Sequence, residues 1–122
     1  MPIVQYRLVT SMSQHLPGVT GVLKNGTLVP LDEAISEAKL VAVYYSAHWC
    51  PPCRKFTPVL NDFYNKVTGK DQKDLEIIFV SSDKNDEEFK EYFGQMSFTA
   101  VPYSVNGAAI KMHHGISGIP CL

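Results

Sequence analysis

The feature that most constrains this chain is a pair of cysteines, Cys50 and Cys53, that closely follow an uninterrupted apolar run at Leu40–Ser46. Such a run is typical of a strand covered on both faces in a parallel sheet. From Cys50 onward, apolar residues recur at helical spacing and predict a long amphipathic helix. The two thiols are therefore expected where a buried strand turns into a helix. The apolar residues of the predicted helix are Phe56, Val59, Leu60, Phe63, Tyr64 and Val67.

Two elements are predicted before that strand. Residues 19–31 should form a hairpin around Asn25-Gly26, a dipeptide that readily adopts positive φ in a two-residue turn. A short helix at 33–39, capped by Asp32, should lead from the hairpin into the strand.

A second apolar run, Leu75–Ser81, predicts another buried strand, and the helix after it should begin at a cap within residues 83–86. Residues 101–105 are interpreted as a short strand or an extended link, and residues 107–114 as a third helix. The order of strand, helix, strand and helix implies right-handed crossovers and an α/β sandwich. The inward face of the second helix should carry Phe89, Tyr92, Phe93 and Met96.

The length of 122 residues suits a single domain with a buried core, and residues 1–122 are interpreted as that domain. Residues 1–18 form an N-terminal extension, with a short strand at 4–9 and a helical turn at 11–16. Hydrophobic residues make up 45% of the chain and charged residues 19%, which excludes a disordered chain.

Charge and apolar length argue against two classes of partner. Eleven basic and twelve acidic residues give a net charge of -1, which leaves no electrostatic footprint for nucleic acid. No apolar stretch approaches the roughly 20 residues of a membrane helix, and the first residues do not resemble a signal peptide. Because three cysteines make a poor disulfide framework, we expect a reducing compartment, the cytoplasm, with the nucleus also accessible.

The dithiol itself predicts redox chemistry. Cys50 falls at the start of the helix, where unpaired backbone N–H groups and the helix dipole favour a thiolate, so Cys50 is the expected nucleophile. Cys53 lies three positions on, on the same helical face, and should be the more buried, resolving thiol. The expected cycle passes through a mixed disulfide with substrate and ends in an internal disulfide that another reductant reopens.

Other interpretations of the same residues remain open. A structural zinc site would need ligands beyond Cys121 and the scattered histidines, so no metal is expected. Trp49 is either a packed core residue or an exposed platform on which a substrate peptide docks. His48 either tunes the thiolate or is only a solvated loop residue.

Several separate motifs resemble the tryparedoxin and nucleoredoxin branch of the thioredoxin superfamily, over most of residues 16–120. They are Trp49-Cys50-Pro51-Pro52-Cys53-Arg54, Phe56-Thr57-Pro58, Phe63-Tyr64, Ile78-Phe79-Val80-Ser81-Ser82-Asp83 and Ala100-Val101-Pro102-Tyr103.

The resemblance implies a thioredoxin-like three-layer α/β sandwich and thiol-disulfide oxidoreductase activity, with Cys50 as nucleophile and Cys53 as resolving thiol. It places Trp49 alongside the dithiol. It also implies that the Ile119-Pro120 peptide bond is cis, that Pro120 lies against the dithiol, and that the backbone before this proline pairs with substrate.

Two departures from the family pattern matter. Many thioredoxins carry a buried Asp six residues before the first cysteine, where this chain has Tyr44, so proton handling is left to water, Tyr44 or His48. The family also continues past its Ile-Pro pair with a hairpin and a final helix, whereas this chain ends at Leu122. The strand at Leu40–Ser46 is then expected to be an open edge beside the active site.

Three outcomes stay open for that edge: that residues 1–18 fold back to cover it, that the chain dimerises through it, or that the protein is a marginally stable short form. Cys121, where the family usually has Thr, is either a disordered terminal thiol or one that reacts with the dithiol or with a second chain.

The function expected from these features is reduction of protein disulfides by the Cys-Pro-Pro-Cys dithiol. Its partners would be protein disulfide substrates and an upstream dithiol reductant, and no cofactor is expected. The alternative is a redox-dependent regulator that binds a signalling protein or a transcription factor. A third interpretation is that a shortened fold is too open for turnover.

Overall fold

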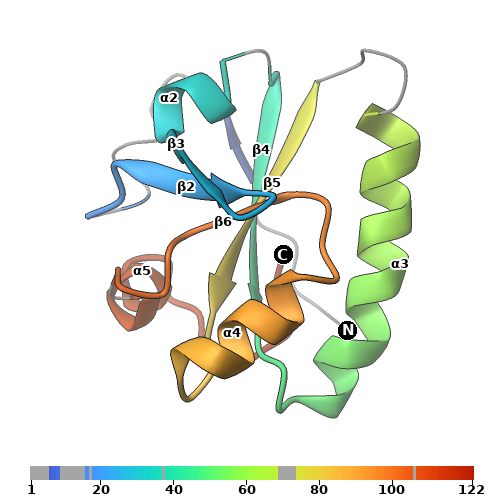
Figure 1. Cartoon of the computed structure of the whole chain (residues 1–122), viewed down its shortest axis with the longest axis vertical. Helices are drawn as coiled ribbons and strands as arrows, with labels where there is room; N and C mark the ends of the chain where they lie inside the picture. Colours follow the sequence, from blue (N-terminus) through green and yellow to red (C-terminus); the bar gives the residue numbers. More distant parts are fainter. Residues whose placement is uncertain (1–5, 9–15, 17, 37, 69–73, 106) are drawn as a thin grey trace.

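The computed structural model describes residues 6–8, 16, 18–36, 38–68, 74–105 and 107–122. These residues form one six-stranded sheet with the strand order β1-β4-β5-β6-β2-β3 (Figure 1). The strands are β1 (Tyr6–Leu8), β2 (Gly21–Lys24), β3 (Thr27–Pro30), β4 (Leu40–Ser46), β5 (Leu75–Ser81) and β6 (Thr99–Ala100). The helices are α2 (Leu31–Ala34), α3 (Pro51–Thr68), α4 (Asp86–Phe93) and α5 (Gly107–His113).

Strands β4 and β5 are the parallel pair on which the molecule is built. They run in register from Leu40 opposite Leu75 to Ser46 opposite Ser81, and both have the bounds predicted from their apolar runs. Because the strands are parallel, their carboxyl ends lie at the same edge of the sheet. That edge carries the loop from β4 into α3, at the lower end of the view in Figure 1.

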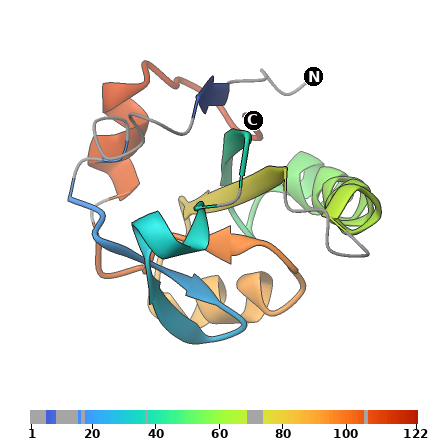
Figure 2. The ribbon, with the colours of Figure 1, turned by 90° about the horizontal axis from the view of Figure 1, so that it is seen from above.

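Side chains of the sheet alternate between two cores, as a pleated strand requires. On β4, Val41, Val43 and Tyr45 pack with residues of α2 and α5 on one face. Ala42 and Tyr44 pack with residues of α3 and α4 on the other face. Figure 2 shows α3 and α5 on opposite sides of the central strands. The predicted three-layer α/β sandwich is confirmed.

The hairpin is confirmed, and the helix after it is misplaced. Asn25 and Gly26 have φ values of 52° and 82° in the turn between β2 and β3. The predicted helix at 33–39 is instead the four-residue α2, and Asp32 lies inside its first turn rather than at the cap. The helix begins early because the Leu31 N–H donates to the Thr20 carbonyl at 3.0 Å, which closes the turn where β3 ends.

Helix α3 is continuous through Pro58, and the predicted Leu60 and Tyr64 are buried, but the rest of its buried face differs from the predicted one. Val59 and Phe63 are 63% and 53% exposed. The stripe that faces the sheet follows the spacing i, i+4, i+7 and i+11, which leaves positions 59 and 63 one step around the helix. That stripe consists of Cys53, Thr57, Leu60 and Tyr64.

The later elements follow the prediction more closely. Asn85, within the predicted capping stretch, caps α4 by accepting a hydrogen bond from the Glu88 N–H at 2.9 Å. Residues 101–105 are an irregular link between the short strand β6 and helix α5, which ends at His113. The inward face of α4 and the loop after it is confirmed as Phe89, Tyr92, Phe93 and Met96.

The edge of β4 is not open in the part of the chain that the structure describes. Of the three outcomes left open for it, the structure shows the first, in which N-terminal residues fold back to cover the strand, and β1 confirms a short strand within residues 4–9. Strand β1 pairs antiparallel with the first half of β4, from Tyr6 opposite Ala42 to Leu8 opposite Leu40. Near the other end, Tyr45 and Cys121 exchange both backbone hydrogen bonds, at 2.7 and 3.0 Å. The two ends of the chain therefore pair with the same strand. The helical turn predicted at 11–16 falls mostly outside the described residues.

Candidate active site

The loop that carries the dithiol joins the carboxyl end of β4 to the start of α3. The Cys50 N–H donates to the Ala47 carbonyl at 3.2 Å, and the Arg54 N–H donates to the Cys50 carbonyl at 3.0 Å. Cys50 therefore sits at the boundary where the first turn of α3 begins. The unpaired N–H groups of such a first turn favour a negative charge nearby.

The two sulfur atoms are in direct contact. The Cys53 thiol donates to the Cys50 sulfur with an Sγ–Sγ distance of 2.7 Å, and both residues are free thiols. Cys50 is 6% exposed and Cys53 is completely buried. This order of exposure fits Cys50 as the thiol that meets a substrate and Cys53 as the thiol behind it.

Burial raises the pKa of Cys53 to about 11, and its hydrogen bond and charge interaction with Cys50 act in the same direction. Hydrogen bonds from the Ser46 side chain and the Ala47 backbone oppose that rise. Cys53 therefore keeps its proton at neutral pH, and this proton points at Cys50. A donated S–H bond stabilises negative charge on the accepting sulfur.

Trp49 lies beside the dithiol as a half-exposed side chain. It is 45% exposed, and its indole Nε1–H donates to the Ser82 carbonyl at 2.9 Å. The Ser82 N–H in turn donates to the Ser46 carbonyl at 2.9 Å, so the loops after β4 and β5 are joined. A ring fixed at one end and open to solvent favours the docking platform over the packed core residue.

His48 belongs to the packing behind the loop. Its imidazole lies edge-on to the Tyr92 ring at 5.6 Å, and its backbone N–H donates to Asp83 Oδ1 at 2.6 Å. Asp83 also accepts from the Ser81 hydroxyl at 2.6 Å. Asp83 lies within the stretch predicted to cap the next helix and was not predicted to be near the dithiol. Its place after β5, at the same sheet edge as the dithiol, was the available signal.

The Ile119-Pro120 segment, near the C-terminus, also lies beside the dithiol. Its peptide bond is cis, as the family resemblance implied. Ile119 packs against the small buried cluster of Ala47, Cys50 and Cys53. Cys121, which follows directly, is buried and paired with β4, so the interpretation as a disordered terminal thiol is wrong.

A row of buried hydroxyl groups lies beneath Cys53. The Ser46 and Tyr92 hydroxyls are 2.6 Å apart, the Tyr44 and Thr57 hydroxyls are 2.7 Å apart, and Tyr92 also bonds Thr57. Sequence reasoning singled out Tyr44 alone and assigned Tyr92 to the apolar core. Ser46 and Thr57 are polar residues inside otherwise apolar patterns, which was the signal that it missed.

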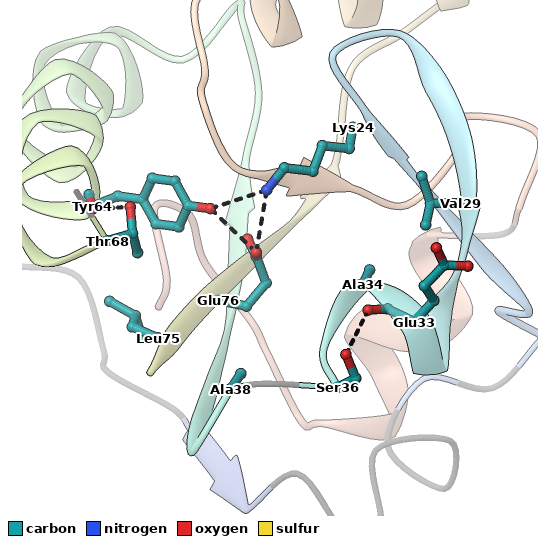
Figure 3. A pocket seen from close by; sticks show the side chains of 10 residues that line it. All are labelled: Lys24, Val29, Glu33, Ala34, Ser36, Ala38, Tyr64, Thr68, Leu75 and Glu76. Carbon is teal, nitrogen blue, oxygen red and sulfur yellow. Dashed lines mark hydrogen bonds and ion pairs between the residues drawn. The ribbon is translucent and has the colours of Figure 1, made fainter. Parts of the chain in front are cut away.

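A second buried polar cluster lies at the amino ends of β4 and β5, and Figure 3 shows it at the wall of a cavity of about 310 Å³. Glu76 is only 6% exposed there. The Tyr64 hydroxyl donates to Glu76 Oε2 at 3.2 Å, and the Lys24 ammonium lies 3.7 Å from the same oxygen. None of these three residues contacts the dithiol in the hydrogen bonds and ion pairs of the described chain.

Two kinds of site are absent from the part of the chain that the structure describes. No cluster of three or more His, Cys, Asp or Glu side chains is arranged to hold a metal ion. No described helix combines the length and the apolar character needed to cross a lipid bilayer.

Comparison with known proteins agrees with this geometry. The family model described as thioredoxin-like matches residues 37–122. Nucleoredoxin from Danio rerio is 44% identical over 106 residues, covering 85% of this chain and 25% of the relative. Tryparedoxin from Trypanosoma brucei brucei is 35% identical over 116 residues, covering 93% of this chain and 78% of the relative.

The solved structure of native tryparedoxin I from Crithidia fasciculata superposes with a TM-score of 0.80 at 32% identity, over 91% of this chain and 76% of that one. The chain spans about a quarter of the length of the nucleoredoxins it matches and about three quarters of the tryparedoxins. Fold, dithiol and relatives agree, and the chain belongs to the thioredoxin-like family of oxidoreductases, in its tryparedoxin and nucleoredoxin branch.

Proposed function

We propose that this protein reduces disulfide bonds in other proteins through Cys50 and Cys53. The observation that carries the proposal is the Cys53-to-Cys50 hydrogen bond of 2.7 Å at the start of α3, with Cys50 on the solvent side. Such chemistry needs a nucleophilic sulfur, and the start of α3 and the Cys53 S–H both place positive partial charge beside the Cys50 sulfur.

The cycle balances with two electrons. The Cys50 thiolate attacks one sulfur of the substrate disulfide, a Cys50–substrate bond forms, and the other substrate sulfur leaves as a thiolate. Cys53 then attacks the Cys50 sulfur, and the second substrate sulfur leaves with the electron pair. The substrate gains two electrons, one proton from the Cys53 thiol and one proton from water, and the protein keeps a Cys50–Cys53 disulfide. An upstream dithiol reductant returns it to the reduced form.

Two segments beside the dithiol support docking of a substrate protein. Trp49 presents a fixed, half-exposed ring on one side. The Ile119-Pro120 segment borders the dithiol on another, through contacts of Ile119. We assign substrate contact to Trp49, Ile119 and Pro120, and we place the reaction in a reducing compartment, the cytoplasm or the nucleus, where the thiols stay reduced.

A second candidate function is redox-dependent binding of a signalling protein or transcription factor. The exposed apolar side chains of Val59 and Phe63 favour it, because they lie on the helix that begins at the dithiol. Its test is to compare partner capture by the reduced and the oxidised protein. Equal binding by both forms would argue against redox control.

Insulin reduction with dithiothreitol as the electron donor tests the reductase. The wild-type protein should accelerate precipitation of the reduced insulin chains. Cys50→Ser should lose all acceleration over dithiothreitol alone, and Cys53→Ser should stall as a covalent adduct. Retention of wild-type acceleration by Cys50→Ser would rule out the mechanism.

A further inference from the structure

Four buried hydroxyl groups beneath Cys53 form a continuous hydrogen-bonded row, the hydroxyl chain, which meets Cys53 at two points. All four are at most 2% exposed. One end is the Ser46 side chain, whose hydroxyl lowers the pKa of the Cys53 thiol, against the effect of burial. A second contact with Cys53 comes from the Thr57 hydroxyl, 2.9 Å from the Cys53 carbonyl oxygen. The order along the chain is Ser46, Tyr92, Thr57 and Tyr44.

The hydrogen bonds of the hydroxyl chain can run in two arrangements, because each hydroxyl donates only one hydrogen bond. In the first, Thr57 donates to the Cys53 carbonyl, Tyr44 and Tyr92 both donate to Thr57, and Ser46 donates to Tyr92. The single Cys53 S–H proton is donated to the Cys50 sulfur, so in this arrangement no hydroxyl proton points at the Cys53 sulfur. The heavy-atom distances fit this arrangement.

In the second arrangement the direction is reversed. Tyr44 donates to Thr57, Thr57 donates to Tyr92, Tyr92 donates to Ser46, and Ser46 donates to the Cys53 sulfur. Either atom can be the donor in each of the three hydroxyl–hydroxyl bonds, so the reversal needs rotation of hydroxyl protons and no movement of heavy atoms.

We propose that this hydroxyl chain serves the second step of the cycle, by turning its donors toward Cys53 as that thiol loses its proton and attacks the Cys50–substrate disulfide. The proposal rests on the proposed function and adds residues that the dithiol motif does not contain. In this proposal Ser46 donates to the reacting sulfur during the attack, and Tyr92, Thr57 and Tyr44 are positioning residues that act through it.

Cys53 needs hydrogen-bond donors during the attack because its sulfur is buried. A completely buried thiolate lacks water, and hydrogen bonds to the charged form are what lower its cost. Burial raises the pKa of Tyr92 and Tyr44, so these hydroxyls stay protonated as donors. A chain of hydrogen bonds in a medium of low dielectric strengthens its last member.

The step is balanced without any proton supplied by the chain itself. The Cys53–Cys50 bond forms, the Cys50–substrate bond breaks, and the substrate sulfur leaves with the electron pair. The proton from Cys53 ends on that departing thiolate. The hydroxyl chain contributes a hydrogen bond during the attack and returns to its first arrangement afterwards.

A disulfide reagent that releases a coloured thiolate, 5,5′-dithiobis(2-nitrobenzoate), separates the two steps. Attack by Cys50 releases one equivalent at a rate that depends on reagent concentration. Attack by Cys53 on the mixed disulfide releases the second equivalent at a rate that does not. Cys53→Ser should show no second phase, which identifies it.

Ser46→Ala and Tyr92→Phe should slow the second phase roughly tenfold, the usual worth of a hydrogen bond to a charged group, while the first phase is unchanged. Tyr44→Phe should slow it less, because Thr57 still donates along the rest of the chain. Thr57→Ser keeps the hydroxyl and should retain the wild-type rate. The matched control is Tyr64→Phe, which removes a buried tyrosine hydroxyl at the other end of the sheet.

A merely structural role predicts a different result, namely equal slowing of both phases or a lowered melting temperature with the second phase intact. Wild-type second-phase rates in both Ser46→Ala and Tyr92→Phe would overturn the hydroxyl-chain proposal and leave the reductase standing. Absence of a second phase in the wild-type protein would instead overturn the reductase mechanism itself.

Discussion

Two buried polar clusters occupy opposite ends of the same pair of strands, and they are built differently. At the carboxyl ends, Ser46 and its neighbours form a cluster of neutral hydroxyls beside Cys53. At the amino ends, Glu76 accepts hydrogen bonds from the Tyr64 hydroxyl and the Ile77 N–H and faces the Lys24 ammonium (Figure 3).

The two clusters differ in whether their hydrogen bonds can reverse direction. A carboxylate only accepts and an ammonium only donates, so the bonds around Glu76 have one direction. Hydroxyls both donate and accept, so the bonds beside Cys53 have two. One end of the sheet therefore holds a fixed charge in place, while the other can respond when a charge appears on a neighbouring sulfur.

Removing Lys24 should have the largest effect on stability and none on the dithiol. Lys24→Met leaves the Glu76 carboxylate without its cation, and we expect the free energy of unfolding at pH 7 to fall by roughly 1–3 kcal/mol. Urea denaturation measures that loss. Both phases of the disulfide-reagent reaction should keep their rates, and a slowed second phase would show that the two clusters are coupled.

The pH dependence of Glu76 sharpens the contrast. Burial raises the pKa of Glu76, and the Lys24 charge only partly opposes it. The folded protein therefore binds a proton at Glu76 more readily than the unfolded chain does. The stability that Glu76 contributes is present in full below the ordinary carboxyl pKa and is lost as pH rises through the raised pKa of the folded state. Glu76→Gln should thus gain stability relative to wild type as pH increases from 4 to 7. An unchanged difference between the two proteins would contradict the raised pKa.

Cys53 should show the same sign at alkaline pH and a smaller effect. Because its pKa is raised to about 11 from the ordinary 9, its contribution to stability is complete below pH 9 and is lost as pH rises toward 11. Cys53→Ala should flatten the stability curve over that interval. Tyr64→Phe, measured alongside it, corrects for the alkaline ionisation of a buried tyrosine at the other cluster.

The sequence predicts the framework of this molecule better than its buried polar groups. The apolar runs locate β4 and β5 to the residue, and Asn25-Gly26 locates the hairpin, because these signals are local. The cysteine spacing likewise predicts which thiols meet. The pairing of β1 and Cys121 with β4 brings the two ends of the chain to the same strand. The sequence predicts a short strand near β1 but leaves open what covers the β4 edge, because no local pattern encodes which strands pair.

The polar clusters were missed for a different reason. Periodicity predicts which residues are buried but not which polar groups meet, so it does not pair Thr57 or Ser46 with Cys53. Glu76 lies within the predicted buried strand Leu75–Ser81, but the pattern names no partner for its carboxylate. Each is buried because a hydrogen-bond partner arrives from an element distant in sequence, such as Tyr92 from α4 or Lys24 from β2.

The site at which a substrate disulfide attaches tests the central claim most directly. Cys53→Ser is incubated with oxidised insulin, the covalent adduct is digested without reductant, and mass spectrometry identifies the cysteine that carries the insulin peptide. The account predicts attachment at Cys50. Attachment at Cys121, or no adduct from a protein whose wild-type form reduces insulin, would contradict it.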